Sequence, residues 1–181
     1  DTYSVIASDF YIGGMEYPTL SMIDKNLYNS KNKFLLEYVI AHETAHQWWY
    51  SVVGNDEVNE PWLDEALTEY STVLYFEKKY GKETATRLMS TMEKQSKSYS
   101  SQDMFKPSSK YKNSMDYSLN VYTKGAVVFH NIREEVGDKV FFKVLKEYYE
   151  TYKFKNANGS QFMELWRKNG VDIDNIIKKC K

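Results

Sequence analysis

Two histidines and a glutamate form the most chemically specific pattern in this chain. His42, Glu43 and His46 occur in the order H-E-x-x-H within residues 34–50, a run that contains neither glycine nor proline. On a helix, residues four apart face the same side, so both imidazoles can bind one metal ion. Glu43 lies beside them and can accept a proton from water that the metal activates. The spacing therefore predicts a zinc-peptidase centre with one Zn²⁺ per chain.

A catalytic zinc ion needs three protein ligands and one open position, so a third residue must join the two histidines. Glu65 is the best candidate, because it lies in the first turn of the next expected helix, shortly after Pro61. Two antiparallel helices joined by a short loop can face each other at that distance. We therefore predict that His42, His46 and Glu65 hold the metal.

Each of these residues also has a structural explanation that involves no metal. His42 and His46 could be core histidines on an apolar helix, although two of the chain's three histidines stand at this spacing. The helix macrodipole favours an acid in the first turn of a helix, and Asp64 meets that condition as well as Glu65 does. The position of Glu65 relative to the histidines is what favours the metal interpretation.

Four motifs, in order along the chain, resemble one peptidase family. The H-E-x-x-H pattern followed after eighteen residues by Glu65 resembles the gluzincin metallopeptidases. The motifs G-G-M-E at 13–16, W-L-D-E at 62–65 and V-Y-T-K-G-A at 121–126 more closely resemble zinc aminopeptidases of the membrane-alanyl-aminopeptidase family. Tyr17 and Pro18 follow the first motif where asparagine is usual, which is similar to one bacterial branch. The resemblance implies a thermolysin-like catalytic domain and an excised fragment of a longer protein.

For the chemistry, the resemblance implies roles for Glu43 and for two tyrosines. Glu43 would be the general base and later the proton donor to the leaving amine. Tyr122 would hydrogen-bond the oxyanion of the tetrahedral intermediate, and Tyr117 would line the substrate pocket. Without the family match, Tyr122 reads as an aromatic residue packed before a helix that Thr123 caps.

For the substrate, the resemblance implies a binding segment at residues 13–16. Gly13, Gly14 and Met15 would let the substrate backbone approach and pair with a strand edge. Glu16 would accept the free α-ammonium group of the substrate, and that ion pair would make the enzyme an exopeptidase. The same four residues also fit an ordinary hairpin with an exposed glutamate.

Glu69 and His130 are weaker candidates. Glu69 lies one helical turn after Glu65 and could orient a ligand histidine, but a solvated helix face is the favoured interpretation. His130 lies in a helical pattern far along the sequence from the H-E-x-x-H motif. We expect it to be an ordinary core or surface histidine.

Composition excludes several classes of function. The net charge of −1 gives no reason to expect nucleic acid binding, and no apolar run approaches the length of a membrane span. Cys180 is the single cysteine and has no partner within the chain. The first residue is aspartate, so the compartment stays open between the cytoplasm and a cell-surface or secreted location reached through a segment outside this chain.

The order of the predicted elements, strands first and then helices, indicates an α+β, predominantly helical fold. Residues 3–23 are expected to be extended with a hairpin signal at Gly13-Gly14, and 24–32 to form a loop. An irregular connection is expected over 99–120. Helices are predicted over 33–53, 61–81, 82–98, 123–136, 138–152, 160–169 and 172–179.

We expect one catalytic domain over residues 1–181, with a β-rich substrate-edge segment at 1–32 and a helical zinc-site portion at 33–181. The family's N-terminal β domain is absent from this chain, so exposed apolar surface and weak activity of the fragment are expected.

The main functional prediction is a zinc aminopeptidase acting on peptides with a free N-terminus. The alternatives are a gluzincin endopeptidase, a relative with epoxide-hydrolysing activity, or a catalytically silent zinc-bound binding module. The sequence does not indicate which N-terminal residue is preferred, or the oligomeric state.

Overall fold

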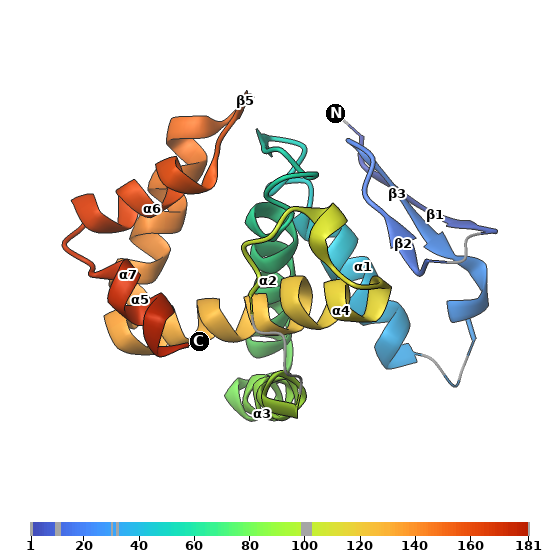
Figure 1. Ribbon diagram of the computed structural model, residues 1–181. Helices are drawn as coiled ribbons and strands as arrows, with labels where there is room; N and C mark the ends of the chain where they lie inside the picture. The colour runs from blue at the N-terminus through green and yellow to red at the C-terminus, as the bar shows by residue number, and fades with distance from the viewer. Residues whose placement is uncertain (1, 10–11, 30, 32, 99–102, 181) are drawn as a thin grey trace.

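A small β-sheet lies at one end of the molecule beside the first helix, and the C-terminal helices lie at the other end (Figure 1). The computed structural model describes residues 2–9, 12–29, 31, 33–98 and 103–180. The fold is α+β and predominantly helical, as predicted.

The sheet has three strands, β1 (Ser4–Ser8), β2 (Gly14–Met15) and β3 (Leu20–Asp24), in the order β1-β3-β2. β1 pairs with β3 in parallel, and β2 pairs with β3 antiparallel. A short 3₁₀ helix, η1 (Lys25–Leu27), follows. The central strand is therefore β3, whose Ile23 is fully buried.

The hairpin turn was expected at Gly13-Gly14, but the structure has it at residues 17–20. The chain reverses between β2 and β3, where the Leu20 N–H donates to the Tyr17 carbonyl at 2.9 Å and Thr19 has a φ of 63°. Pro18 lies in this turn, where its fixed φ suits the position before a residue of positive φ. Residues 10 and 11 of the expected strand lie outside the described residues.

The first helix, α1 (Lys33–Ala45), is shorter than the predicted 33–53. Beyond it the N–H groups of Gln47 and Trp48 donate to carbonyls three residues back, and Tyr50 has a φ of 130°. The tight turn leads into β4 (Val53–Gly54), which pairs in parallel with β5 (Lys155–Asn156). The apolar run after His46 extended the helical pattern in the sequence, but these residues form the turn.

The next two helices match their predicted bounds closely, α2 (Trp62–Tyr80) and α3 (Lys82–Ser98). Gly81, with a φ of 90°, separates them. α2 lies in the middle of the molecule in Figure 1 and contacts α1, α3 and α5. One side of α2 is buried in the core through Leu63, Ala66, Leu67, Tyr70, Val73 and Phe76.

The predicted irregular connection over 99–120 is wrong in its second half. It contains the short 3₁₀ helix η2 (Ser108–Lys110) and α4 (Ser114–Ser118), and then the π-helix η3 (Leu119–Lys124). Asn113 begins α4 by accepting the Asp116 N–H at 2.9 Å. The asparagine cap and the serines explain why the composition resembled a loop. Residues 99–102 lie outside the described residues.

The last helices are α5 (Gly125–Tyr152), α6 (Gly159–Lys168) and α7 (Ile173–Lys179). Gly137, with φ 78° and ψ 159°, kinks α5 where the sequence predicted a break. Arg133 bonds to Glu77 at 2.6 Å and to Asp138 at 2.7 Å, so it fixes the kink against α2. At the start of α5, a Cβ built on Gly125 would lie 2.3 Å from the Ala66 Cβ, so α5 and α2 approach closely there.

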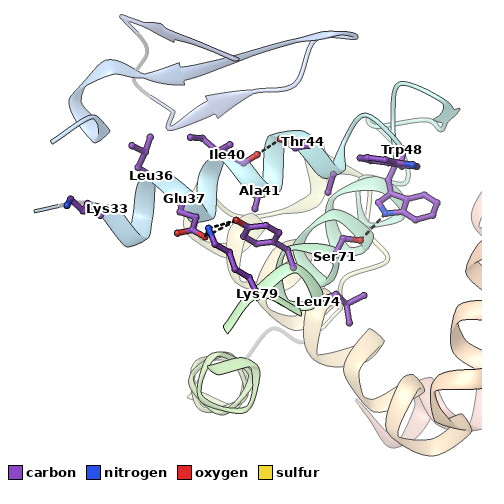
Figure 2. Close-up of a pocket in the computed structure, with 13 residues that line it drawn as sticks. Lys33, Leu36, Glu37, Ile40, Ala41, Thr44, Trp48, Ser71, Leu74 and Lys79 are labelled. Carbon is purple, nitrogen blue, oxygen red and sulfur yellow. Dashed lines mark hydrogen bonds and ion pairs between the residues drawn. The ribbon is translucent and has the colours of Figure 1, made fainter. Parts of the chain in front are cut away.

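Two apolar grooves lie on the outer faces of the helices. Figure 2 shows one of 810 Å³ between α1 and α2, with Ile40, Trp48 and Leu74 among its lining residues. The other, of 1100 Å³, lies among α1, α2 and α3. Exposed apolar surface is therefore present, as expected. Among the described residues, no helix is both long and apolar enough to cross a membrane.

Candidate metal and catalytic site

The structure brings His42, His46 and Glu65 together. His42 lies in the last turn of α1, His46 follows that helix directly, and Glu65 lies in the first turn of α2. One carboxylate oxygen, Glu65 Oε2, lies 3.3 Å from His42 Nε2 and 3.1 Å from His46 Nε2. The three potential ligand atoms lie within 4.8 Å of one another. Asp64, the equal alternative in the sequence, is not a member of this group.

The second ring nitrogen of His42 has its own partner. His42 Nδ1 lies 2.9 Å from Glu69 Oε2, and the other oxygen of Glu69 accepts the hydroxyl of Tyr38. Glu69 is only 8% exposed, so the favoured interpretation of a solvated helix face is wrong. Its side chain points inward because α1 packs against this face of α2.

His46 is oriented by a different set of groups. Its Nδ1 lies 3.0 Å from the carbonyl oxygen of Trp49 and 3.2 Å from the Thr68 hydroxyl. The tight turn after α1 brings this carbonyl back to the ring. In both histidines Nδ1 therefore has an acceptor, which leaves Nε2 to face Glu65.

These residues fit a zinc ion by their donor chemistry. Two imidazoles and one carboxylate are a ligand set of catalytic zinc sites, and each imidazole has the outer partner that fixes its tautomer. His42 and His46 are 8% and 1% exposed. Two buried histidines facing a half-buried carboxylate have few structural explanations, because buried ionisable groups are costly unless they are paired or bind a metal.

Electrostatics couple the three groups strongly. Burial disfavours the charged form of His42, but hydrogen bonds to Glu65 and Glu69 outweigh it and raise the pKa of His42 well above 6.5. The pKa of His46 is raised in the same way through Glu65. Burial would raise the pKa of Glu65, but both histidines lower it below the usual range for a carboxyl. Both imidazoles therefore hold a proton more strongly than a free imidazole does, and a bound cation would displace these protons.

Glu43 lies against the substrate-edge segment. The side chain is buried, and its Oε2 has no hydrogen-bond partner among the described residues. A Cβ built on Gly14 would lie 2.3 Å from Glu43 Oε1, so any larger residue at that position of β2 would have to displace the Glu43 side chain. Burial is the main cause that raises the pKa of Glu43 to about 7, and a carboxyl with that pKa can exchange protons near neutrality.

Glu16 lies on the same side of the site. Oxygen atoms of Glu16 and Glu43 and a ring nitrogen of His46 lie within 4.8 Å of one another. Met15 pairs with Met22, and Gly14 pairs with Ile23, so β2 presents its backbone at the edge of the sheet beside Glu43. The structure thus brings the 13–16 segment to the metal-site helix.

Tyr122 lies beside Glu65 and His42, and Tyr117 packs against Tyr122. The Tyr122 hydroxyl donates to Glu65 Oε1 at 2.6 Å, and its ring stacks on the His42 ring with centroids 5.6 Å apart. The Tyr117 ring packs edge-on against Tyr122 at 5.8 Å. Burial and the Glu65 charge raise the pKa of Tyr122 well above 10, so its phenol stays a donor. The expected alternative, a helix capped by Thr123, is wrong because the π-helix runs through this residue into α5.

His130 lies away from the site, as expected, with its Nδ1 3.4 Å from the Tyr70 hydroxyl. Three residues that sequence reasoning missed attach the sheet to α1. Tyr3 OH lies 2.8 Å from Ser21 Oγ and 3.0 Å from Thr44 Oγ1. Ser21 is fully buried and donates to the Glu43 carbonyl at 3.3 Å. A polar residue between the apolar Leu20 and Met22 was the available signal for Ser21, but nothing indicated its partners.

Comparison with known proteins places this arrangement in context. Residues 1–179 match the family model described as the peptidase family M1 domain. The chain is similar to a leucine aminopeptidase 2-1 of Meyerozyma guilliermondii, with 27% identity over 96% of this chain and 29% of the relative. It is also similar to the aminopeptidase B of Mus musculus, with 29% identity over 90% of this chain and 27% of the relative.

A solved structure has the same fold. The M1 zinc metallopeptidase from Deinococcus radiodurans matches 98% of this chain and 38% of its own, with a TM-score of 0.80 and 18% identity. The chain spans less than a third of the length of the two aminopeptidases it matches.

Proposed function

Because the chain belongs to peptidase family M1, we propose that it contains the catalytic centre of a zinc aminopeptidase that removes N-terminal residues from peptides. The convergence of His42, His46 and Glu65 supports this proposal most directly. The names of the relatives, a leucine aminopeptidase and an aminopeptidase B, support the substrate class.

His42, His46 and Glu65 would hold one zinc ion. A zinc ion bound there would supply a Lewis acid that lowers the pKa of water and polarises the scissile carbonyl. Glu69 and the Trp49 carbonyl would keep both imidazoles in the tautomer that binds through Nε2.

Glu43 would move the protons of the reaction. Its free oxygen, Oε2, would accept a proton from the attacking water as the new carbon–oxygen bond forms. The same carboxyl would then give that proton to the leaving nitrogen as the carbon–nitrogen bond breaks. A pKa near 7 suits both steps, because the group can hold and release a proton at neutral pH.

Tyr122 and Glu16 would bind two different groups of the substrate, the oxyanion that forms from the scissile carbonyl and the α-ammonium group. The Tyr122 hydroxyl, now donated to Glu65, would turn to the oxyanion that forms from the carbonyl. Glu16 would bind the α-ammonium group through an ion pair, which requires a free N-terminus. Gly14 would let β2, and a substrate backbone paired with it, lie close to Glu43, and Tyr117 would pack behind Tyr122.

The test compares aminoacyl substrates that have a free or a blocked N-terminus. The zinc-loaded wild-type chain should cleave only the free form, and a chelator should abolish cleavage. Glu16→Gln should cleave the free form about 100-fold more slowly with unchanged zinc content, because it removes a charge-assisted contact to the substrate. Glu83→Gln, an exposed acid on α3, is the matched control and should behave as wild type.

Equal cleavage of blocked and free substrates would contradict the aminopeptidase proposal and favour an endopeptidase. One zinc per chain without any cleavage, even by a longer form of the protein, would favour a silent binding module.

A further inference from the structure

A chain of hydrogen bonds leads from His42 through Glu69 to Tyr38. His42 Nδ1 bonds Glu69 Oε2, and Glu69 Oε1 accepts the hydroxyl of Tyr38. The two oxygens of one carboxylate are thus divided between the imidazole and the phenol. Without the phenol, the Glu69 carboxylate could rotate about its last torsion, which is broad and has low barriers.

The Tyr38 ring is held by aromatic packing. It stacks on the fully buried Phe76 of α2 with centroids 5.7 Å apart and an interplanar angle of 30°. The Phe34 ring lies 6.2 Å from it on α1. The ring therefore has a fixed position between the two helices that supply the metal ligands, and its hydroxyl has a fixed direction.

His46 is oriented differently by the described residues, through a backbone carbonyl and a hydroxyl. His46 Nδ1 lies beside the Trp49 carbonyl, whose position the backbone turn sets, and beside Thr68. Among the described residues, His42 is the histidine whose Nδ1 partner is a flexible carboxylate, so this ligand needs a second group to hold its partner.

We propose that Tyr38 is a positioning residue of the metal centre, whose hydroxyl fixes Glu69 and thereby directs the His42 Nε2 toward Glu65. This inference rests on the proposed function, because it assumes that the three ligands bind Zn²⁺. The packing of the ring alone could be provided by phenylalanine. The hydroxyl is the part of Tyr38 that serves the metal.

The test measures Zn²⁺ affinity of the full chain by competition with a chromophoric chelator. Changes to outer partners of a zinc ligand cost about 10- to 100-fold in affinity. We expect Glu69→Gln to fall in this range and Tyr38→Phe to weaken Zn²⁺ binding by about threefold to tenfold, because it acts one bond further out. In a Glu69→Ala background, which removes the side chain that bonds both groups, Tyr38→Phe should have no further effect.

Tyr80→Phe is a matched control. Tyr80 also stacks on Phe76, at 5.6 Å, and its hydroxyl also donates to a glutamate, Glu37, at 2.7 Å. Its removal should leave Zn²⁺ affinity unchanged. The visible spectrum of the Co²⁺-substituted chain gives a second readout, which should change in Tyr38→Phe and not in Tyr80→Phe.

Two results would overturn the inference. Wild-type affinity and an unchanged cobalt spectrum in Tyr38→Phe would show that the hydroxyl does not act on the metal. An equal loss of affinity with and without Glu69 would show that Tyr38 acts through general packing. A wild-type chain that binds no Zn²⁺ would contradict the proposed function as well, whereas failure to cleave peptides alone would leave the positioning role intact.

Discussion

The two sides of the candidate site are built in different ways. On the helical side, His42, His46 and Glu65 project from α1, the turn after it and α2, and buried or half-buried hydrogen bonds fix their orientation. On the sheet side, β2 has two residues and contributes mainly backbone, with a glycine packed on Glu43. The proposed metal side depends on side-chain chemistry, whereas the proposed substrate side depends on the Glu16 charge and on how closely the backbone of β2 approaches Glu43.

Because of this difference, we expect the two sides to be sensitive to different kinds of substitution. On the helical side, Zn²⁺ affinity or reaction rate should fall when a donor atom is removed or when the protonation of a ligand or of Glu43 changes. The sheet side should fail through the addition of volume, even when no polar group is removed. Four measurements test whether the two sides differ in this way.

The largest effect is expected for Glu43→Gln, which removes the proposed proton acceptor and keeps the shape of the side chain. Loss of a general base costs about 100- to 10,000-fold in rate. Zinc content, measured by elemental analysis, should stay at the wild-type level because Glu43 is not among the three proposed ligands. Activity within about tenfold of wild type would assign the proton transfer to another group.

Gly14→Ala should be the next most harmful change, at about 100-fold in rate, because a misplaced catalytic group costs that much. The added Cβ would lie 2.3 Å from Glu43 Oε1 and must displace it. Gly13→Ala is the matched control, since its Cβ meets no atom within 4 Å but its φ is 89°.

Gly13→Ala should therefore lower the free energy of unfolding by about 1–2 kcal/mol and affect the rate less. Rates and denaturation curves of both variants separate crowding from backbone strain. If Gly13→Ala slowed the reaction more than Gly14→Ala did, the contact with Glu43 would not be what matters.

The pH dependence of Zn²⁺ binding tests the helical side. In the metal-free chain the pKa values of His42 and His46 lie above 6.5, and Zn²⁺ must displace those protons. Affinity should therefore rise with pH and continue to rise above pH 6.5, by about tenfold per unit for each proton displaced. Chelator competition between about pH 6 and about pH 9 measures it; an affinity that levels off at pH 6.5 would contradict the raised pKa values.

Thr68→Val should have the smallest effect. It removes the hydroxyl 3.2 Å from His46 Nδ1, but the Trp49 carbonyl remains as an acceptor. Zn²⁺ affinity should fall by about threefold, the lower range for one hydrogen bond. A loss as large as that of Glu69→Gln would mean that both histidines depend equally on side-chain partners.

Local patterns predicted the helical side well. The i, i+4 histidines, the apolar spacing of α2 and the glycine at 81 are all properties of contiguous sequence, and the structure has α2 and α3 close to the predicted bounds. The end of α1 was wrong because the residues after His46 are apolar, yet a backbone turn forms to bond the His46 ring.

Long-range contacts account for what the sequence could not predict. Glu69 reads as a surface acid until α1 is placed against it, and the role of Tyr38 depends on that same contact. Likewise, the parallel pairing of β1 with β3 and the bond from Ser21 to the Glu43 carbonyl join segments about twenty residues apart. No periodicity within either segment encodes such a pairing.

The π-helix η3 allows one short segment to contact two neighbouring residues of α2 in different ways. Its hydrogen bonds span five residues, so this turn holds more residues than an α-helical turn does. Through it, the Tyr122 hydroxyl reaches Glu65 while Gly125 packs on Ala66, the very next residue. Deleting one of the two residues between Tyr122 and Gly125 would rotate Tyr122 by about 100° relative to α5 without shortening the packed helix. The wide turn therefore sets the direction of the Tyr122 hydroxyl separately from the angle at which α5 packs on α2.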